Sequence, residues 1–212
     1  MEITSRKELN FVIKADYMMN RGYFTPSILT KIKNLLMPDY IMNYLVLMRK
    51  INYLSTYVNR NSKAYFAKFK LAYYKIKYYH LGIKLSFSIG PQVLGYGCVI
   101  PHYGSLGVGS SNRLGNYCVL HTLTSITDNG KVIGNALYLS KGAKITSKII
   151  LGDNISIGAN SVVNKSFPEG NIMIAGAPAR IIKESQPWYI RDGKIYADRV
   201  RKIETLKKQL GL

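Results

Sequence analysis

Apolar residues recur at intervals of six along the second half of the chain, at Ile133, Leu139, Ile145, Leu151, Ile157 and Val163. Neither the period of a helix nor the alternation of a strand produces this spacing. A short strand followed by a tight turn does, with three such units closing one coil of a parallel β-helix. Glycine follows three of these ladder residues, and we expect it there because it enters unusual backbone conformations without steric cost.

The same ladder runs through an earlier stretch, with interruptions. Its residues there are, in order, Leu94, Ile100, Val108, Leu114 and Leu120. One step is of eight residues instead of six, and between Leu120 and Ile133 the register breaks at residues 127–131. Because Asp-Asn-Gly at 128–130 is a sequence typical of turns, we expect a loop that leaves the coil wall there.

Residues 1–85 carry a helical pattern instead. Leu45, Met48, Ile51 and Leu54 recur at steps of three, and Tyr65, Phe69, Ala72 and Ile76 at steps of four, three and four. Pro26 and Pro38 mark expected boundaries near helix starts. The second set belongs to a face rich in Tyr and Lys, and we expect this face to pack on the next domain with its lysines in solvent. The alternative is contact with an anionic surface or substrate.

A further helix is predicted over residues 196–210, with Val200, Ile203, Leu206 and Leu210 on one face that packs or contacts another subunit. The chain thus divides into a helical N-terminal domain at 1–85, a β-helix at 86–183 and a helical C-terminal extension at 184–212. The expected fold class is mainly β.

Composition narrows the function. Cys98 and Cys118 are too few for a disulfide framework, and with no signal peptide and no membrane-spanning run they indicate a cytoplasmic protein. The formal net charge is +19, and residues 1–85 hold 15 Lys and Arg against 4 Asp and Glu. No nucleic-acid-binding motif accompanies this charge, so we expect no nucleic-acid partner. No metal site is expected.

The six-residue ladder, the segment at 157–163 and the Gly-Ala-Pro-Ala-Arg ending at 176–180 together resemble the hexapeptide-repeat acyltransferases. The resemblance covers about residues 86–183. It implies a left-handed parallel β-helix, an exception to the usual right-handed crossover. It also implies a homotrimer that holds acetyl-CoA between neighbouring coils.

Residues 100–109, Ile-Pro-His-Tyr-Gly-Ser-Leu-Gly-Val-Gly, resemble the catalytic segment of serine O-acetyltransferases, and the family's catalytic histidine falls on His102. A hydroxyl that attacks a thioester must lose its proton, and an imidazole can accept that proton and return it to the departing thiolate. Tyr103 and His121 are candidate contacts for the acceptor. By position, the resemblance also implies acetyl-CoA contacts at Ala159, Asn160, Lys165, Arg180, Lys183 and Lys141.

The site departs from serine-specific relatives. Pro101 stands where they have an Asp, Phe87 replaces the Asp that orients their histidine, and residues 130–132 lack their second active-site histidine. The acceptor is therefore expected to be a sugar hydroxyl of a surface polysaccharide, as in similar capsule-assembly enzymes. Serine remains the first alternative, and a non-catalytic β-helix scaffold is the second.

Two further expectations concern partners. Asp16 or Asp39 could orient His102 within the chain or from a neighbouring subunit, or a backbone carbonyl could hold its tautomer. The basic N-terminal region could draw an anionic carrier or membrane surface to the site.

Overall fold

The computed structural model describes residues 1–212 and opens with four helices. They are α1 (Arg6–Arg21), α2 (Ile28–Leu36), α3 (Tyr40–Arg60) and α4 (Tyr65–Leu85). Ser5 and Glu8 form a capping box at the start of α1, and Gly22 ends that helix at φ 82°. Asp39 caps α3 by accepting from the Met42 amide, so the boundary expected near Pro38 is confirmed.

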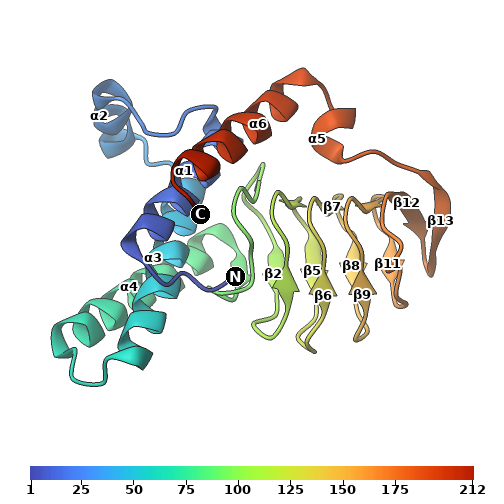
Figure 1. Ribbon diagram of the computed structural model, residues 1–212. Helices are drawn as coiled ribbons and strands as arrows, with labels where there is room; N and C mark the ends of the chain where they lie inside the picture. Colours follow the sequence, from blue (N-terminus) through green and yellow to red (C-terminus); the bar gives the residue numbers. More distant parts are fainter.

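A parallel β-solenoid follows, with three sheets as its walls (Figure 1). The first contains β1 (Phe87–Ile89), β2 (Leu106–Val108), β5 (Thr124–Ile126), β8 (Lys144–Ile145) and β11 (Val162–Val163). The second contains β4 (Val119–Leu120), β7 (Tyr138–Leu139), β10 (Ser156–Ile157), β12 (Ile172–Gly176) and β13 (Ala179–Glu184). The third contains β3 (Arg113–Leu114), β6 (Val132–Ile133) and β9 (Ile150–Leu151). Only the pair β12–β13 is antiparallel, and this hairpin ends the coil.

The ladder residues fill the centre of the coil, as predicted. All six from Ile133 to Val163 are at most 3% exposed and belong to one core cluster of 32 residues. Cys98 and Cys118 are buried free thiols in the same cluster. Such a core is held by burial of apolar surface, which contributes about 25 cal/mol per Å².

The reason expected for the ladder glycines is wrong. Gly115, for example, is not among the residues with positive φ. A Cβ there would lie 2.6 Å from the backbone nitrogen of Asn135 in the next coil. Glycine is therefore required because successive coils stack closely, while Tyr117 and Ala136 take the positive φ values in the turns that follow.

Both irregular steps of the ladder have a local cause. The eight-residue step places two extra residues in the turn between Ile100 and β2, which carries His102. The second break is a single extra residue between Ile126 and Ile133, so the expected outward loop at 127–131 is wrong: the turn is compact. Asp128 accepts from the Ser111 amide at 2.7 Å, and Lys131 is buried with its ammonium 2.6 Å from the Thr127 carbonyl oxygen.

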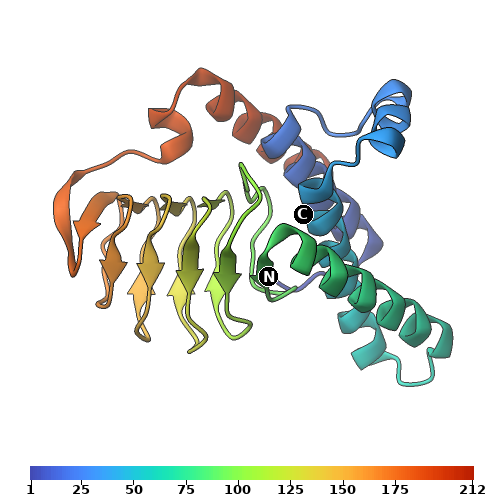
Figure 2. The same ribbon diagram turned by 180° about the vertical axis from the view of Figure 1, so that it is seen from behind.

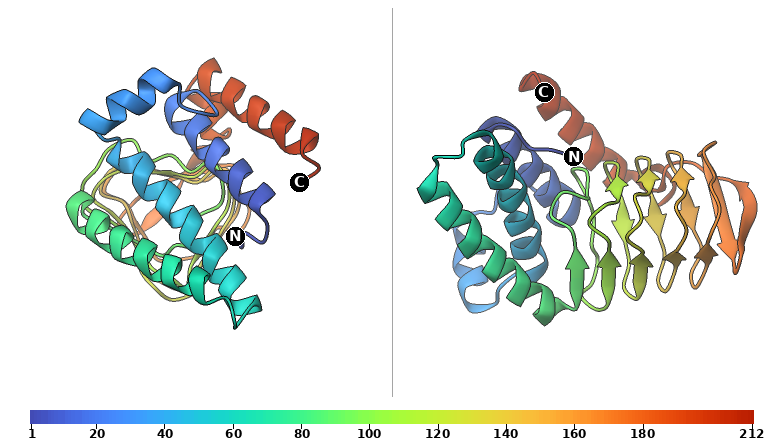
Figure 3. Two further views of the ribbon diagram at one scale, coloured as in Figure 1. Left: turned by 90° about the vertical axis from the view of Figure 1, so that its left-hand side faces the viewer. Right: turned by 90° about the horizontal axis from the view of Figure 1, so that it is seen from below.

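Helices α1, α3 and α4 cover one end of the coil, opposite the hairpin (Figures 1 and 3). The joint holds a buried ion pair, in which Arg49 Nε donates to Asp16 at 2.8 Å. Arg49 also donates to the carbonyls of Leu94 and Gly95, each at 2.6 Å, and Asp16 accepts from the Gly97 amide at 2.9 Å. These bonds fix the helical cap onto the first coil.

The expected packing of the Tyr- and Lys-rich face of α4 is confirmed for Tyr78, whose hydroxyl donates to the Ile89 carbonyl at 2.8 Å, and is wrong for the set that begins at Tyr65. Tyr65, Phe69 and Ile76 are 76%, 81% and 59% exposed. Helix α4 packs on α3 through Leu71, Tyr74 and Tyr78, so two of the tyrosines of the predicted face are at this contact. No helix of the structure is both long and apolar enough to cross a membrane.

The C-terminal segment returns along the outside of the coil, from the hairpin to α1 (Figures 1 and 2). It contains α5 (Trp188–Arg191) and α6 (Lys194–Gln209). Trp188 is 2% exposed and donates to the Tyr117 carbonyl at 2.7 Å, while Glu204 accepts from the hydroxyls of Tyr96 and Tyr117. The expected packing role of this helix is confirmed, since Ile203 is fully buried.

Candidate functional site

One edge of the coil gathers most of the predicted site residues. It is formed by the turns at 101–105, 121–123, 140–142 and 158–160, each leading into a strand of the first sheet, and is called the histidine edge below. The turns are stacked by backbone bonds, from Leu123 N to the Ser105 carbonyl and from Gly142 N to the Thr122 carbonyl. His102, His121, Lys141, Ala159 and Asn160 all lie on it.

The turn that carries His102 is held on both sides. The Ile100 amide donates to the side-chain oxygen of Asn20 at 3.2 Å, and the Gly104 amide donates to the Leu85 carbonyl at 3.0 Å. The two extra residues of this turn leave the side chains of His102 and Tyr103 exposed. The imidazole of His102 makes no hydrogen bond within the chain, so it is free to contact a ligand.

His121 is half-buried, and its Nε2 lies 3.0 Å from the Tyr138 hydroxyl. Burial lowers the pKa of His121, and the charge of His102 lowers it further, while Asp192 opposes this. His121 is therefore held toward its neutral form beside His102. The sequence predicted His121 only as a possible lining residue.

Three residues beside this edge were not predicted: Tyr138, Arg191 and Asp192. Arg191 donates to the Ser156 hydroxyl at 2.7 Å, forms an ion pair with Asp192 at 2.7 Å, and lies 5.1 Å from the Tyr138 ring centroid. The only sequence signal was the place of Tyr138 one residue before a ladder position. Arg191 and Asp192 lie in α5, whose return to the coil no local pattern indicates.

The predicted acetyl-CoA residues fall into two groups. Ala159 and Asn160 lie exposed on the turn after β10, stacked on Lys141 by a bond from the Asn160 amide to the Lys141 carbonyl. Neither the amide nor the carbonyl of Ala159 has a backbone partner. Arg180 is in register with Ala175, which contacts the position of Gly158, so Arg180 lies next to this turn.

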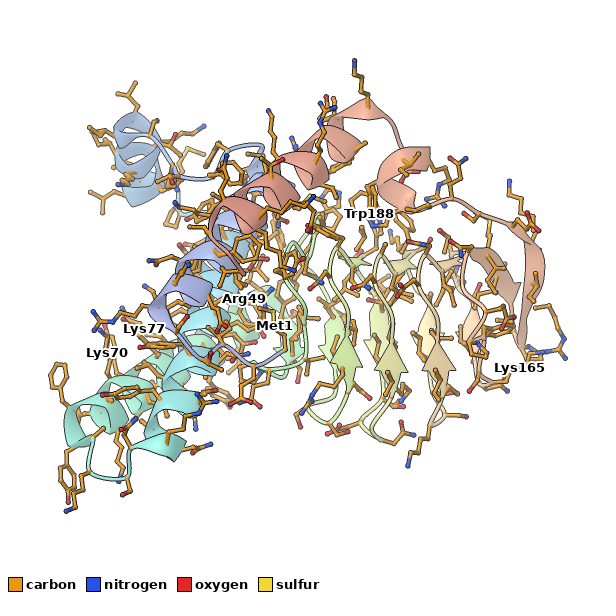
Figure 4. The ribbon with its side chains drawn as sticks, in the orientation of Figure 1. Met1, Arg49, Lys70, Lys77, Lys165 and Trp188 are labelled. Carbon is orange, nitrogen blue, oxygen red and sulfur yellow. The ribbon has the colours of Figure 1, made fainter.

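The other two predicted phosphate contacts lie elsewhere. Lys165 stands on the edge after β11, with its ammonium 5.1 Å from the Phe167 ring centroid (Figure 4). Lys183 lies further along β13, in register with Met173. Within one chain, neither shares the histidine edge. No group of three or more His, Cys, Asp or Glu side chains is positioned to hold a metal ion.

The two carboxylates considered as partners of His102 are engaged with arginines in this chain. Asp16 is 1% exposed in the ion pair with Arg49 at the base of the helical cap. Asp39 accepts from Arg21 at 2.6 and 2.7 Å, which together with the Met42 amide lowers its pKa against the effect of burial. Neither carboxylate bonds to His102 within the chain, because each is paired with a guanidinium instead.

A search of protein-family models finds no match. The chain is 31% identical over 99 residues to a serine acetyltransferase of Synechococcus elongatus, which is 43% of this chain and 40% of the relative. It is 39% identical over 62 residues to an Escherichia coli K12 protein named as a lipopolysaccharide biosynthesis O-acetyl transferase, which is 29% of this chain and 31% of the relative. The chain is a relative of the hexapeptide-repeat acyltransferases.

The fold agrees with this relationship. The crystal structure of the Brucella abortus serine acetyltransferase in complex with coenzyme A matches with a TM-score of 0.58 and 24% identity, over 84% of this chain and 68% of that chain. The expected architecture of a parallel β-helix with helices at both ends of the chain is thereby confirmed as the fold of that serine acetyltransferase. The chain spans less than half the length of the two curated relatives described above.

Proposed function

We propose that the chain is an acetyl-CoA-dependent O-acetyltransferase with His102 as its general base. One observation carries the proposal. The insertion in the coil exposes His102, without an internal partner, on the same edge as the turn of Ala159 and Asn160. The relatives described above are acetyltransferases, which supports the same reaction class.

The chemistry follows from an imidazole at this place. Acetyl-CoA supplies the thioester carbonyl, and the acceptor supplies a hydroxyl. His102 takes the hydroxyl proton as the new carbon–oxygen bond forms, and it gives that proton to the thiolate when the carbon–sulfur bond breaks. General acid–base catalysis of this kind contributes about 10²- to 10⁴-fold.

The residues of the histidine edge fit acetyl-CoA. The small exposed side chain of Ala159 and its unpaired backbone groups suit an amide-rich pantetheine arm. Arg180 has no acidic partner and is exposed, so its guanidinium can meet a phosphate with two hydrogen bonds. Lys141, Lys165 and Lys183 remain proposed contacts to phosphate, the last two toward a neighbouring subunit.

For the acceptor, we propose serine. Several curated relatives are serine acetyltransferases, and they favour serine over the sugar that the sequence analysis expected. The ion pair of Arg191 and Asp192 near His121 adds a specific reason. A free amino acid carries a carboxylate and an ammonium, and on binding these would exchange for the mutual bond of the half-exposed pair, the carboxylate meeting Arg191 and the ammonium meeting Asp192.

A sugar hydroxyl is the second candidate. Phe87, at the place of the orienting Asp, is 6% exposed and packs on the Tyr44 ring, so it offers no contact to an amino group. Pro101 likewise carries no charge. The lipopolysaccharide-related protein in the comparison is consistent with such an acceptor, to which Tyr103 would present an exposed aromatic ring.

Release of coenzyme A from acetyl-CoA, followed with a thiol reagent, tests these proposals. Serine and a panel of sugars are offered separately, and the acetylated product is identified by mass spectrometry. O-acetylserine supports the first acceptor, and an acetylated sugar supports the second. A chain that releases no coenzyme A with any acceptor would be the non-catalytic scaffold, and the proposed reaction would be wrong.

We also propose a homotrimer. Lys165 and Lys183 lie outside the histidine edge of their own chain, and packing of subunits side by side would bring these lysines to the histidine edge of a neighbouring chain. Sedimentation velocity should give the mass of three chains, or of six if trimers pair through the helical ends. A single-chain mass at assay concentration would contradict this proposal.

Finally, we propose that the protein acts in the cytoplasm and contacts an anionic membrane surface through its helical end. Helix α2 buries none of its residues, and Ile28 and Leu35 are 76% and 82% exposed. Exposed apolar stripes flanked by lysines are typical of helices that lie on membranes. Co-sedimentation with anionic vesicles should fall for Leu35→Ser and stay unchanged for Ile195→Ser, which removes a side chain of 68% exposure from α6.

A further inference from the structure

A groove of about 950 Å³ is lined by residues of α1, α3 and α4. These helices lie at the end of the molecule remote from the hairpin (Figure 3). This volume lies within the range of about 300–1,000 Å³ typical of small-molecule sites. Its surface is mainly apolar and aromatic and includes Tyr53, Leu54, Phe66 and Tyr74. Phe66 is 84% exposed at the rim, so the groove is open to solvent along one side.

Every charged residue of the groove is a cation. They are Arg6, Lys50, Lys63 and Lys70. None of them belongs to an ion pair, because the five ion pairs of the chain involve other residues. The sequence contains no Asp or Glu between Asp39 and Asp128, so α3 and α4 supply no acid at all. No acidic side chain lines the groove to balance these cations.

Two of these cations converge on one ring. The ammonium groups of Lys50 and Lys70 lie 5.5 and 5.8 Å from the centroid of the Tyr74 ring. Two like charges held near one aromatic ring repel each other, and a doubly charged anion that contacts both would relieve this repulsion. Figure 4 shows Lys70, with Lys77, on α4 at this end of the molecule.

We infer that this groove binds a lipid with a phosphate monoester headgroup. The phosphate lies between Lys50 and Lys70, and the apolar chain lies along Tyr53, Leu54 and Phe66. Self-association through the same groove is disfavoured, because it would bring together two acid-free faces of the same charge. The inference stands apart from acetyl transfer, since the groove and the histidine edge share no residue.

The probe is decyl phosphate, added to the full-length chain in a calorimetric titration, with inorganic phosphate and decanol as separate arms. Decyl phosphate should bind with an affinity at least about tenfold higher than either arm, because both parts of the groove are then filled. Lys50→Gln/Lys70→Gln should weaken its binding about tenfold. Lys148→Gln/Lys202→Gln removes the same charge at exposed positions elsewhere and should not change it.

Ala67→Trp fills the groove without changing charge, and it should also abolish binding while circular dichroism and acetyl transfer stay as in the parent. Vesicles that contain phosphatidic acid should retain the parent more than this variant. The inference is wrong if inorganic phosphate binds as well as decyl phosphate, or if Ala67→Trp binds as the parent does. It is also wrong if Ala67→Trp lowers the mass of the assembly while decyl phosphate leaves the parent unaffected, since the groove would then hold a second copy of the chain.

Discussion

Replacing Asp16 by Asn should strongly destabilise the protein. The variant keeps the shape of the side chain but leaves the Arg49 guanidinium buried without its counter-charge, at 0% exposure. Of the two hydrogen bonds that Arg49 donates to Asp16, at 2.8 and 3.2 Å, only one can persist, because asparagine keeps a single acceptor oxygen. The bonds to the carbonyls of Leu94 and Gly95 remain but supply no counter-charge. Breaking a buried pair by removing one partner costs about 3–5 kcal/mol.

Urea unfolding followed by circular dichroism measures this loss. With a slope of at most about 3 kcal/mol per molar urea, the midpoint should fall by at least about 1 M. Asp198→Asn is the matched control, because it breaks the exposed Arg201–Asp198 pair at 2.9 Å and should cost less than about 1 kcal/mol. Equal midpoints for the two variants would refute the view that the buried pair fixes the helical cap to the coil.

Three other outcomes are expected. Gly115→Ala should lower the free energy of unfolding by about 2 kcal/mol, because the added Cβ meets the next coil. Gly107→Ala is the control: a Cβ there has nothing within 4 Å, so the free energy of unfolding should stay within about 0.5 kcal/mol of the parent's. Equal effects of the two substitutions would contradict close coil stacking. By NMR, His121 should titrate below the ordinary histidine value, and His102→Ala should raise the pKa of His121; no change would show that the two rings do not interact. Because the unfolded chain then binds this proton more readily than the folded chain, His121 should cost stability as the pH falls below about 6.5. Trp188→Ala should cost about 3–5 kcal/mol by urea unfolding, and a cost below about 1 kcal/mol would mean that the C-terminal return is not anchored there.

The coil could be predicted from sequence because its period is local and repeats many times. Each ladder residue from Ile133 to Val163 occupies the same inward position, so the pattern can still be recognised when one position of the repeat departs from it. The reason for the glycines could not be predicted in the same way. The spacing between stacked coils is a property of residues about eighteen positions apart, and a single turn does not reveal it.

The surroundings of His102 needed the three-dimensional structure. Its own place followed from the segment at 100–109, but Tyr138 and Arg191 reach the histidine edge only through coil stacking and the return of α5. The exposed face of α4 was misjudged for a related reason. Its periodicity predicted a helix correctly, but periodicity does not say which of two apolar faces meets α3.

The central claim is that His102 is the base of an acetyl transfer from acetyl-CoA. Coenzyme A release is measured with the best acceptor for the parent, His102→Ala and His80→Ala, the last removing an exposed histidine from α4. The account predicts a loss of about 10²- to 10⁴-fold for His102→Ala with unchanged folding, and parental activity for His80→Ala. A His102→Ala variant as active as the parent would contradict it.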